Sequence, residues 1–159
     1  MKSILWAIAI QLAFPCAAFS VGLKYQPLQL KNNYSNPEQV VQYYCGRDAS
    51  GFVWTGFLDV ERREFTVWEQ VPQHEAFLVA TQYEIKKVKE TANRAIVRVL
   101  YNLDGMADAH QTRMPASEDR RTVEFHLRKV DGKWKIFEPL PQNLPPVILK
   151  GQFPLVMPQ

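Results

Sequence analysis

The sequence is poor in cysteine, glycine and histidine, and each shortage excludes a class of protein. Two cysteines in 159 residues cannot build a disulfide framework, and seven glycines leave no glycine-rich loop of the kind that cradles phosphate. The three histidines lie far apart in the chain and form no metal-ligand motif. We therefore expect neither a metal ion nor another cofactor.

The chain also lacks a strong excess of one charge. It has 19 basic and 16 acidic residues, a net charge of +3, and no continuous block of basic residues. A nucleic-acid binder concentrates basic residues on one face, so this distribution predicts no nucleic-acid partner. The composition, 47% hydrophobic and 22% charged, is typical of a single globular domain.

The N-terminal 20 residues resemble a targeting segment. One positive charge at Lys2 precedes an apolar run over residues 4–14, which is shorter than the roughly 20 residues needed to span a bilayer. Pro15 then interrupts the run, and small residues permit cleavage after Ala18 or Ser20. The segment therefore predicts a signal peptide over residues 1–20 and a secreted or periplasmic protein.

Two alternatives to a cleaved signal peptide stay open. One is a lipoprotein anchored through Cys16, although the preceding Phe and Pro differ from a lipoprotein box. The other is an uncleaved anchor, which would be the protein's contact with a membrane. After cleavage Cys45 is the remaining thiol, and its place on an apolar helical stripe predicts a buried side chain.

The mature chain begins with an aperiodic, extended lead-in over residues 21–35. A helix then starts after Asn36, which is a suitable N-cap, with Pro37 at the first helical position. Spacings of three and four residues predict that this helix buries one stripe. Its members are Val40, Val41, Tyr44 and Cys45. A second short helix is expected through residues 52–57.

The remainder of the chain predicts antiparallel strands. Alternating residues indicate strands over 76–88, 95–103 and 123–128, and Asp131-Gly132 is a hairpin turn leading into 134–137. We expect Asp104-Gly105 to end the second strand and residues 106–120 to form an exposed loop. Residues 140–159 are expected to be an extended surface tail, because six of the eleven prolines follow Glu138.

The strand pattern assigns one face to the core and the other to the surface. The expected inward residues are Val79, Thr81, Tyr83, Ile85, Ala95, Val97, Val99, Tyr101, Leu103, Val123, Phe125 and Leu127. The outward face mixes charges, which predicts cross-strand ion pairs on either a solvated surface or a homodimer interface. Its residues are Gln82, Glu84, Arg98, Asn102, Glu124, His126 and Arg128.

This order of elements predicts an α+β fold, with N-terminal helices packed into a curved antiparallel sheet. The helix-to-turn stretch over 37–48 and the strand-turn-strand stretch over 125–136 resemble the nuclear transport factor 2-like (cystatin-like cone) superfamily, and the resemblance covers residues 36–139. It implies a cone-shaped α+β barrel with a pocket at one end. That fold hosts ketosteroid isomerase-like and dehydratase-like enzymes as well as non-catalytic binding and assembly modules, so it does not settle the function.

The residues favour a non-catalytic module. No expected inward strand position carries a carboxylate, so the acid-base candidates reduce to Asp48, as a base, with Tyr44 as a hydroxyl donor. The structural roles are favoured over these catalytic ones: Asp48 caps a helix, and Tyr44 fills the core. The expected lining of an apolar ligand pocket is Tyr44, Trp54, Tyr83, Val99, Tyr101 and Phe125.

Three functions therefore remain for the experiments to separate. The first is a secreted binding or assembly module, with a small apolar ligand in the pocket or a partner on the outer sheet face. The second is a small-molecule isomerase, dehydratase or cyclase of the ketosteroid isomerase-like type. The third is a structural component of the cell envelope or of secretion machinery.

Overall fold

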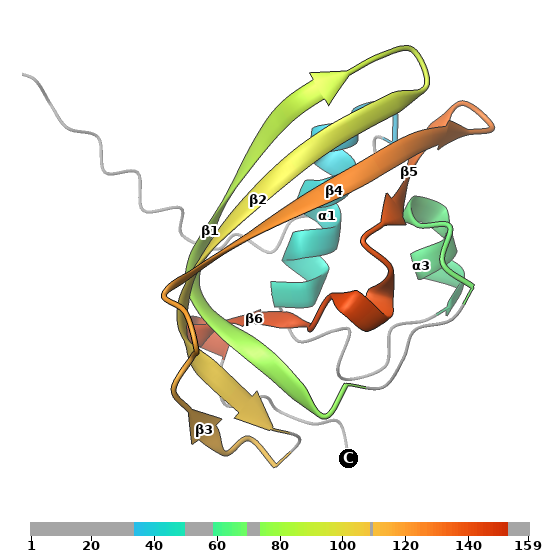
Figure 1. The fold of residues 1–159 in the computed structure, drawn as a ribbon. Helices are drawn as coiled ribbons and strands as arrows, with labels where there is room; N and C mark the ends of the chain where they lie inside the picture. Colours follow the sequence, from blue (N-terminus) through green and yellow to red (C-terminus); the bar gives the residue numbers. More distant parts are fainter. Residues whose placement is uncertain (1–33, 50–58, 70–73, 109, 153–159) are drawn as a thin grey trace, which may run out of the picture.

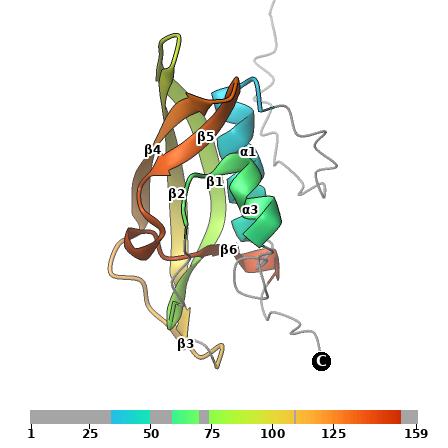
Figure 2. The ribbon, with the colours of Figure 1, turned by 90° about the vertical axis from the view of Figure 1, so that its right-hand side faces the viewer.

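The structure, a computed structural model, describes residues 34–49, 59–69, 74–108 and 110–152. Two helices lie on one side of a strongly curved sheet, and α1 occupies its concave face (Figures 1 and 2). The predicted α+β class is confirmed in this form. The elements are α1 (Pro37–Ala49), α3 (Asp59–Phe65), β1 (Ala76–Glu90), β2 (Arg94–Asp108), β3 (Arg113–Met114), β4 (Arg120–Val130), β5 (Lys133–Glu138), β6 (Val147–Leu149) and the short 3-10 helices Pro141–Asn143 and Lys150–Gln152.

The sheet has the strand order β5-β4-β2-β1-β6, and β3 pairs with the end of β2. Every described pairing between these strands is antiparallel except that of β1 with β6. The long pairings of β1 with β2 and of β2 with β4 make up most of the curved sheet, which wraps around α1 (Figure 1).

The first helix begins where the sequence predicts. The Oδ1 atom of Asn36 accepts hydrogen bonds from the backbone N–H groups of Glu38, at 2.9 Å, and Gln39, at 3.4 Å, which makes Asn36 the N-cap. The predicted apolar stripe is buried, as expected for a helix lying against the concave face of a sheet. The predicted second helix over 52–57 lies outside the described residues.

The second strand is longer than predicted. It continues through Asp104 and Gly105 to Asp108, and β3 pairs with its last residues, so part of the expected loop over 106–120 belongs to the sheet. A Cβ atom on Gly105 would lie 2.8 Å from the Met114 carbonyl oxygen, so glycine allows β3 to approach β2 here. The Asp-Gly pair therefore marks an irregular pairing rather than a turn.

Two register shifts in the β1–β2 pairing correct the predicted faces of β1. The register skips Asp104 on β2 and Thr81 on β1, so the alternation changes side at this point. As a result Val79 lies in a separate buried cluster with Phe77, Ala107 and Ile148, and Thr81 is exposed. The expectation that Val79 and Thr81 face the main core with Tyr83 is wrong because a strict period of two does not allow for an inserted residue.

The β4–β5 hairpin matches the prediction. Asp131 has a φ of 51° and Gly132 a φ of 77°, and two successive residues with positive φ are typical of the type I′ turn. The turn places Leu127 on β4 beside Ile136 on β5, and both side chains are buried against α1 and its neighbours. Their packing fixes the register of the hairpin.

The segment that follows β5 is not an extended surface tail. Val147 and Ile148 are buried, and β6 pairs in parallel with residues 78–80 of β1. Leu144 also packs into the main core. The prolines at 145 and 146 precede the strand, where a missing N–H does not interrupt the pairing, so a proline count was a poor guide to burial here.

Candidate functional site

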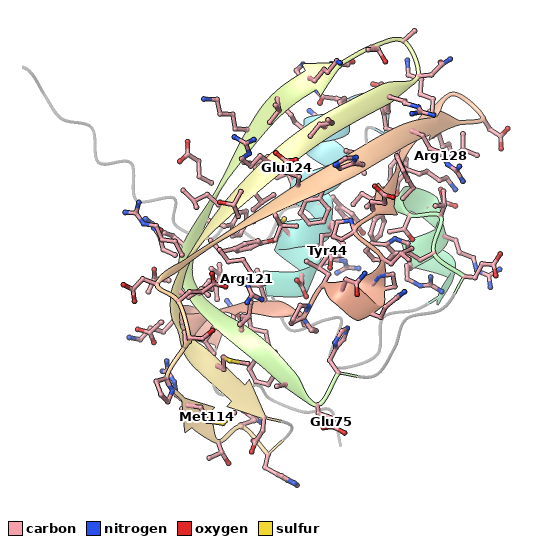
Figure 3. The ribbon with its side chains drawn as sticks, viewed as in Figure 1. Tyr44, Glu75, Met114, Arg121, Glu124 and Arg128 are labelled. Carbon is pink, nitrogen blue, oxygen red and sulfur yellow. The ribbon has the colours of Figure 1, made fainter. Side chains whose placement is uncertain are left out.

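The buried ionisable side chains that could take part in chemistry meet between α1 and the middle of the sheet. Tyr44, Cys45 and Asp48 lie on the buried face of α1, and Tyr101 projects from β2 into the same core. The Cys45 Sγ atom lies 3.2 Å from the Tyr101 hydroxyl oxygen. We call these four residues the interior polar cluster; Figure 3 shows Tyr44 between the helix and the sheet.

Asp48 connects this cluster to the C-terminal segment. Asp48 is 1% exposed, and its Oδ2 atom accepts a hydrogen bond of 2.9 Å from the backbone N–H of Val147. Within the described part of the chain its Oδ1 atom has no hydrogen-bond partner. The carboxyl group therefore holds β6 against the helix.

Burial determines the protonation of the cluster. It raises the pKa of Asp48 to about 8, and the Val147 hydrogen bond offsets part of this effect. Burial also raises the pKa of Tyr44, Cys45 and Tyr101, with the charge of Asp48 as a further cause. Consequently all four groups are protonated in most molecules at neutral pH. The cluster then contains hydrogen-bond donors and neither a carboxylate nor a thiolate.

Aromatic side chains surround the cluster and fill the concave side of the sheet. The Tyr44 ring lies 5.7 Å from Trp68 and 5.4 Å from Phe125, measured between ring centroids. Tyr83 and Tyr101 are 5.9 Å apart in the same way. These rings pack on one another as core aromatics do.

Most of the predicted pocket residues therefore belong to one cluster. Tyr44, Val99, Tyr101 and Phe125 are fully enclosed in the main core, Tyr83 is partly buried beside it, and Trp54 lies outside the described residues. Two aromatic residues that the sequence did not single out, Phe65 and Trp68, also pack on the Tyr44 ring, with centroids 6.3 and 5.7 Å away. Helical spacing gives no signal for this pair, because α3 ends at Phe65 and Trp68 lies beyond it.

The predicted outer face is present and carries the expected ion pair. Arg98 on β2 and Glu124 on β4 are in register, with 2.6 Å between Nη2 and Oε1. His126 Nδ1 lies 3.5 Å from Glu138 Oε2, and the Arg128 guanidinium lies over the Phe137 ring. The strand register puts Glu84 on β1 and Asn102 on β2 on the same face as Arg98, so the face is a mixed-charge surface.

Neither a metal cluster nor a membrane-spanning helix is found in the part of the chain that the structure describes. No three residues of the types His, Cys, Asp and Glu are grouped to hold a metal ion in this part. None of its helices combines the length and hydropathy needed to cross a bilayer.

Comparisons with protein-family models, with curated proteins and with solved structures find no match to the chain.

Proposed function

We propose that the protein is a secreted or periplasmic, non-catalytic binding or assembly module with the cone-shaped fold of the nuclear transport factor 2-like superfamily. A long helix on the concave face of a curled sheet supports that fold, and the apolar N-terminal segment supports export. The type I′ turn between β4 and β5 agrees with the strand-turn-strand pattern on which the resemblance rests.

One observation carries the choice of a non-catalytic role. The four groups of the interior polar cluster are enclosed, protonated and engaged in holding the fold together. A general base must reach a substrate proton within hydrogen-bond distance, and a nucleophile must reach an electrophile. Residues sealed beneath packed aromatic rings do neither, so recognition by this protein takes place on its surface or in a core that a ligand opens.

A second candidate function has one specific observation in its favour. A carboxyl group with a pKa near neutral pH, adjacent to tyrosine hydroxyls, is the combination that acid-base enzymes of the ketosteroid isomerase-like type employ, and burial brings the pKa of Asp48 to about 8. The arrangement would act as an isomerase, dehydratase or cyclase if a small apolar substrate entered among the aromatic rings.

Turnover and binding measurements on Asp48→Asn and Tyr44→Phe separate these functions. Purified protein is screened by thermal shift against steroids, polyketides, fatty acids and aromatic acids, and any hit is then assayed for conversion. At a hundredfold excess over Kd a bound ligand stabilises the fold by about 2.7 kcal/mol. The proposed module shows no conversion, and any ligand it binds stays bound in Asp48→Asn.

The opposite result would establish an enzyme. Conversion by the wild type that falls by about a hundredfold or more in Asp48→Asn, the usual contribution of a positioned acid or base, contradicts the non-catalytic proposal. Absence of a thermal shift with every compound class leaves the outer surfaces as the binding sites and favours the assembly role.

A further inference from the structure

The fold gathers basic residues that are dispersed in the sequence. Residues 86–94 and residues 128–135 each contain four basic and one acidic residue, so together they carry a net charge of +6, whereas the whole chain carries +3. The remaining residues are therefore net negative, at −3. We call these two segments the basic end of the sheet.

The two segments lie side by side. They are the β1–β2 and β4–β5 hairpins, which project from the same end of the sheet in Figure 1. The backbone N–H of Lys129 donates to the Asn93 carbonyl oxygen at 3.1 Å, and Arg94 is in register with Arg128. The charges of Arg94 and Arg128 therefore lie on adjacent paired strands within one Debye length, about 8 Å at physiological ionic strength, and the two hairpins contribute to one positive potential.

Few of these cations are neutralised by the protein itself. Lys87 pairs with Glu90 at 2.9 Å, and Lys133 pairs with Glu64 at 3.4 Å. Within the described residues the remaining six cations form no ion pair. They are Lys86, Lys89, Arg94, Arg128, Lys129 and Lys135.

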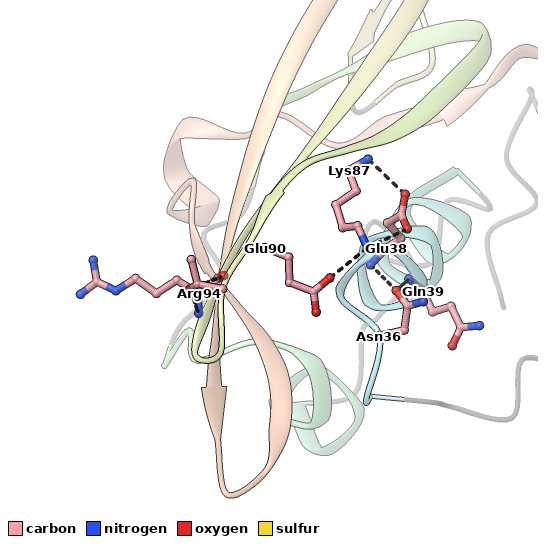
Figure 4. A network of polar contacts seen from close by, with 7 residues as sticks. Asn36, Glu38, Gln39, Lys87, Glu90 and Arg94 are labelled. Atoms are coloured by element: carbon pink, nitrogen blue, oxygen red, sulfur yellow. Dashed lines mark hydrogen bonds and ion pairs between the residues drawn. The ribbon is translucent and has the colours of Figure 1, made fainter.

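Three of these cations lie side by side on adjacent strands, and their mutual repulsion destabilises the folded sheet. Arg94, Arg128 and Lys135 form one row in register across β2, β4 and β5, and like charges directly opposite one another destabilise a sheet. Arg98 and Glu124, on the same face, carry opposite charges instead. Figure 4 shows Arg94 directed to the other side of the sheet from the network of Glu38, Lys87 and Glu90. An anionic partner on the outer face would turn this repulsion into attraction.

The point at which the chain enters the described fold indicates which anionic partner fits. The backbone N–H of Trp134 donates to the Tyr34 carbonyl oxygen at 2.8 Å, and that of Lys87 donates to Glu38 Oε1 at 3.1 Å. The chain therefore enters the described fold beside both basic hairpins, immediately after a segment that includes the apolar run 4–14. Wherever that run engages a bilayer, during export or as a retained anchor, the basic end is the part of the domain that lies beside the first residues of the described fold.

An exposed apolar side chain lies among the same cations. Val88 is 47% exposed and sits between Lys87 and Lys89 on β1. An aliphatic side chain flanked by lysines suits the boundary between lipid headgroups and acyl chains, because the lysine stems can follow it while their ammonium groups stay in water.

We propose that the basic end docks on anionic phospholipid membranes. Lys86, Lys89, Arg94 and Arg128 bind the headgroups, and Val88 enters the interface. A second copy of the chain does not suit this end, since two such ends repel. Each cation held near an anionic bilayer contributes about fivefold in affinity, and added salt weakens the contribution.

Vesicle cosedimentation of the full chain tests this proposal. Binding to mixed phosphatidylcholine and phosphatidylglycerol vesicles is compared with binding to phosphatidylcholine alone, and the difference is the measured quantity, so that insertion of an apolar N-terminus cancels. We expect a preference for the anionic vesicles that salt abolishes. The double variant K86Q and K89Q should reduce it about 25-fold.

A matched variant controls for net charge. R120Q and R121Q remove two charges from the other end of β4, and should leave the preference within about twofold of the wild type, because those residues lie beyond the screening distance. If K86Q and K89Q do not fold, R94Q and R128Q replace them, since they relieve a like-charge contact.

Three results would overturn the proposal. They are equal binding to the two kinds of vesicle, an equal loss in the control variant, and binding to an acidic polypeptide or nucleic acid without binding to anionic vesicles. None of these depends on turnover or on apolar ligands, so a failure here is distinct from a failure of the proposed function.

Discussion

Replacing Asp48 by asparagine should stabilise the protein, and the gain should increase with pH. Asparagine has the shape of a protonated carboxyl group, and its Oδ1 atom can accept the same hydrogen bond from Val147, which is 2.9 Å long in the wild type. It differs in having no proton to lose. The variant therefore removes the titration of Asp48 while keeping its contact with β6.

The magnitude follows from the pKa of the buried group. In the unfolded chain the carboxyl ionises near 3.8, whereas in the folded protein burial raises its pKa to about 8. Between these values the folded state holds one proton more than the unfolded state, so the free energy of unfolding falls as pH rises, by about 1.4 kcal/mol per pH unit. Over the full window the wild type loses roughly 6 kcal/mol to this group, and below the window the two proteins have similar stability.

Urea unfolding followed by the fluorescence of the buried Trp68 and Trp134 measures the effect. The difference in unfolding free energy between Asp48→Asn and the wild type should widen steadily between about pH 5 and about pH 8. Asp131→Asn makes the same chemical change in the exposed hairpin turn and should follow the wild-type profile. A constant difference across this range would show that Asp48 is ionised in the folded state as it is in the unfolded state, and would refute the assignment of a protonated carboxyl at neutral pH.

Three further predictions follow from the packing and the outer face. Ile148→Ala should lower the unfolding free energy by about 2–5 kcal/mol in the same assay, because the side chain is fully buried beside Val79; no loss would mean that β6 is dispensable. Cys45 should resist thiol reagents until the protein unfolds, because it is enclosed and its pKa is raised by burial; rapid labelling of the native protein would contradict this. If light scattering at two concentrations reveals a dimer, Arg98→Glu should dissociate it by placing like charges beside Glu124, and a dimer that survives must use another surface.

The parts of the fold that follow from local chemistry could be predicted from the sequence. An asparagine before a proline and a repeat of three and four residues specify the start and the buried face of α1. The Asp131-Gly132 pair specifies a tight hairpin, since both residues tolerate positive φ. These features need no information about the rest of the chain.

The parts that failed depend on pairing with distant strands. The register shifts near Thr81 and Asp104 exist because β1 and β2 are paired, and neither segment alone shows which residue is skipped. Likewise Val147 and Ile148 are buried because β1 offers a free edge at residues 78–80, almost 70 residues earlier. A short apolar triplet after two prolines does not distinguish an edge strand from a loop.

The interior polar cluster was predicted in part for the same reason. The spacing of four residues puts Tyr44 and Asp48 on one side of a helix, but it leaves their depth open. Burial of Asp48 depends on β6, whose Val147 supplies the hydrogen bond that compensates part of the desolvation cost. Because the sequence does not predict β6, it does not predict the burial of Asp48 either.

The basic end shows that folding can concentrate charge that is dispersed along the sequence. Each hairpin alone has a net charge of +3, which is common for a solvated turn, and more than 30 residues separate the two. An electrostatic potential sums over space, so the two charges combine once β4 pairs with β2. The register matters as much as the pairing, because a shift of one residue would turn Arg94 and Arg128 to the concave face and bring Ala95 and Leu127 out into solvent. The packing of those apolar residues against the core therefore also fixes the basic row on the outside, where a membrane can reach it.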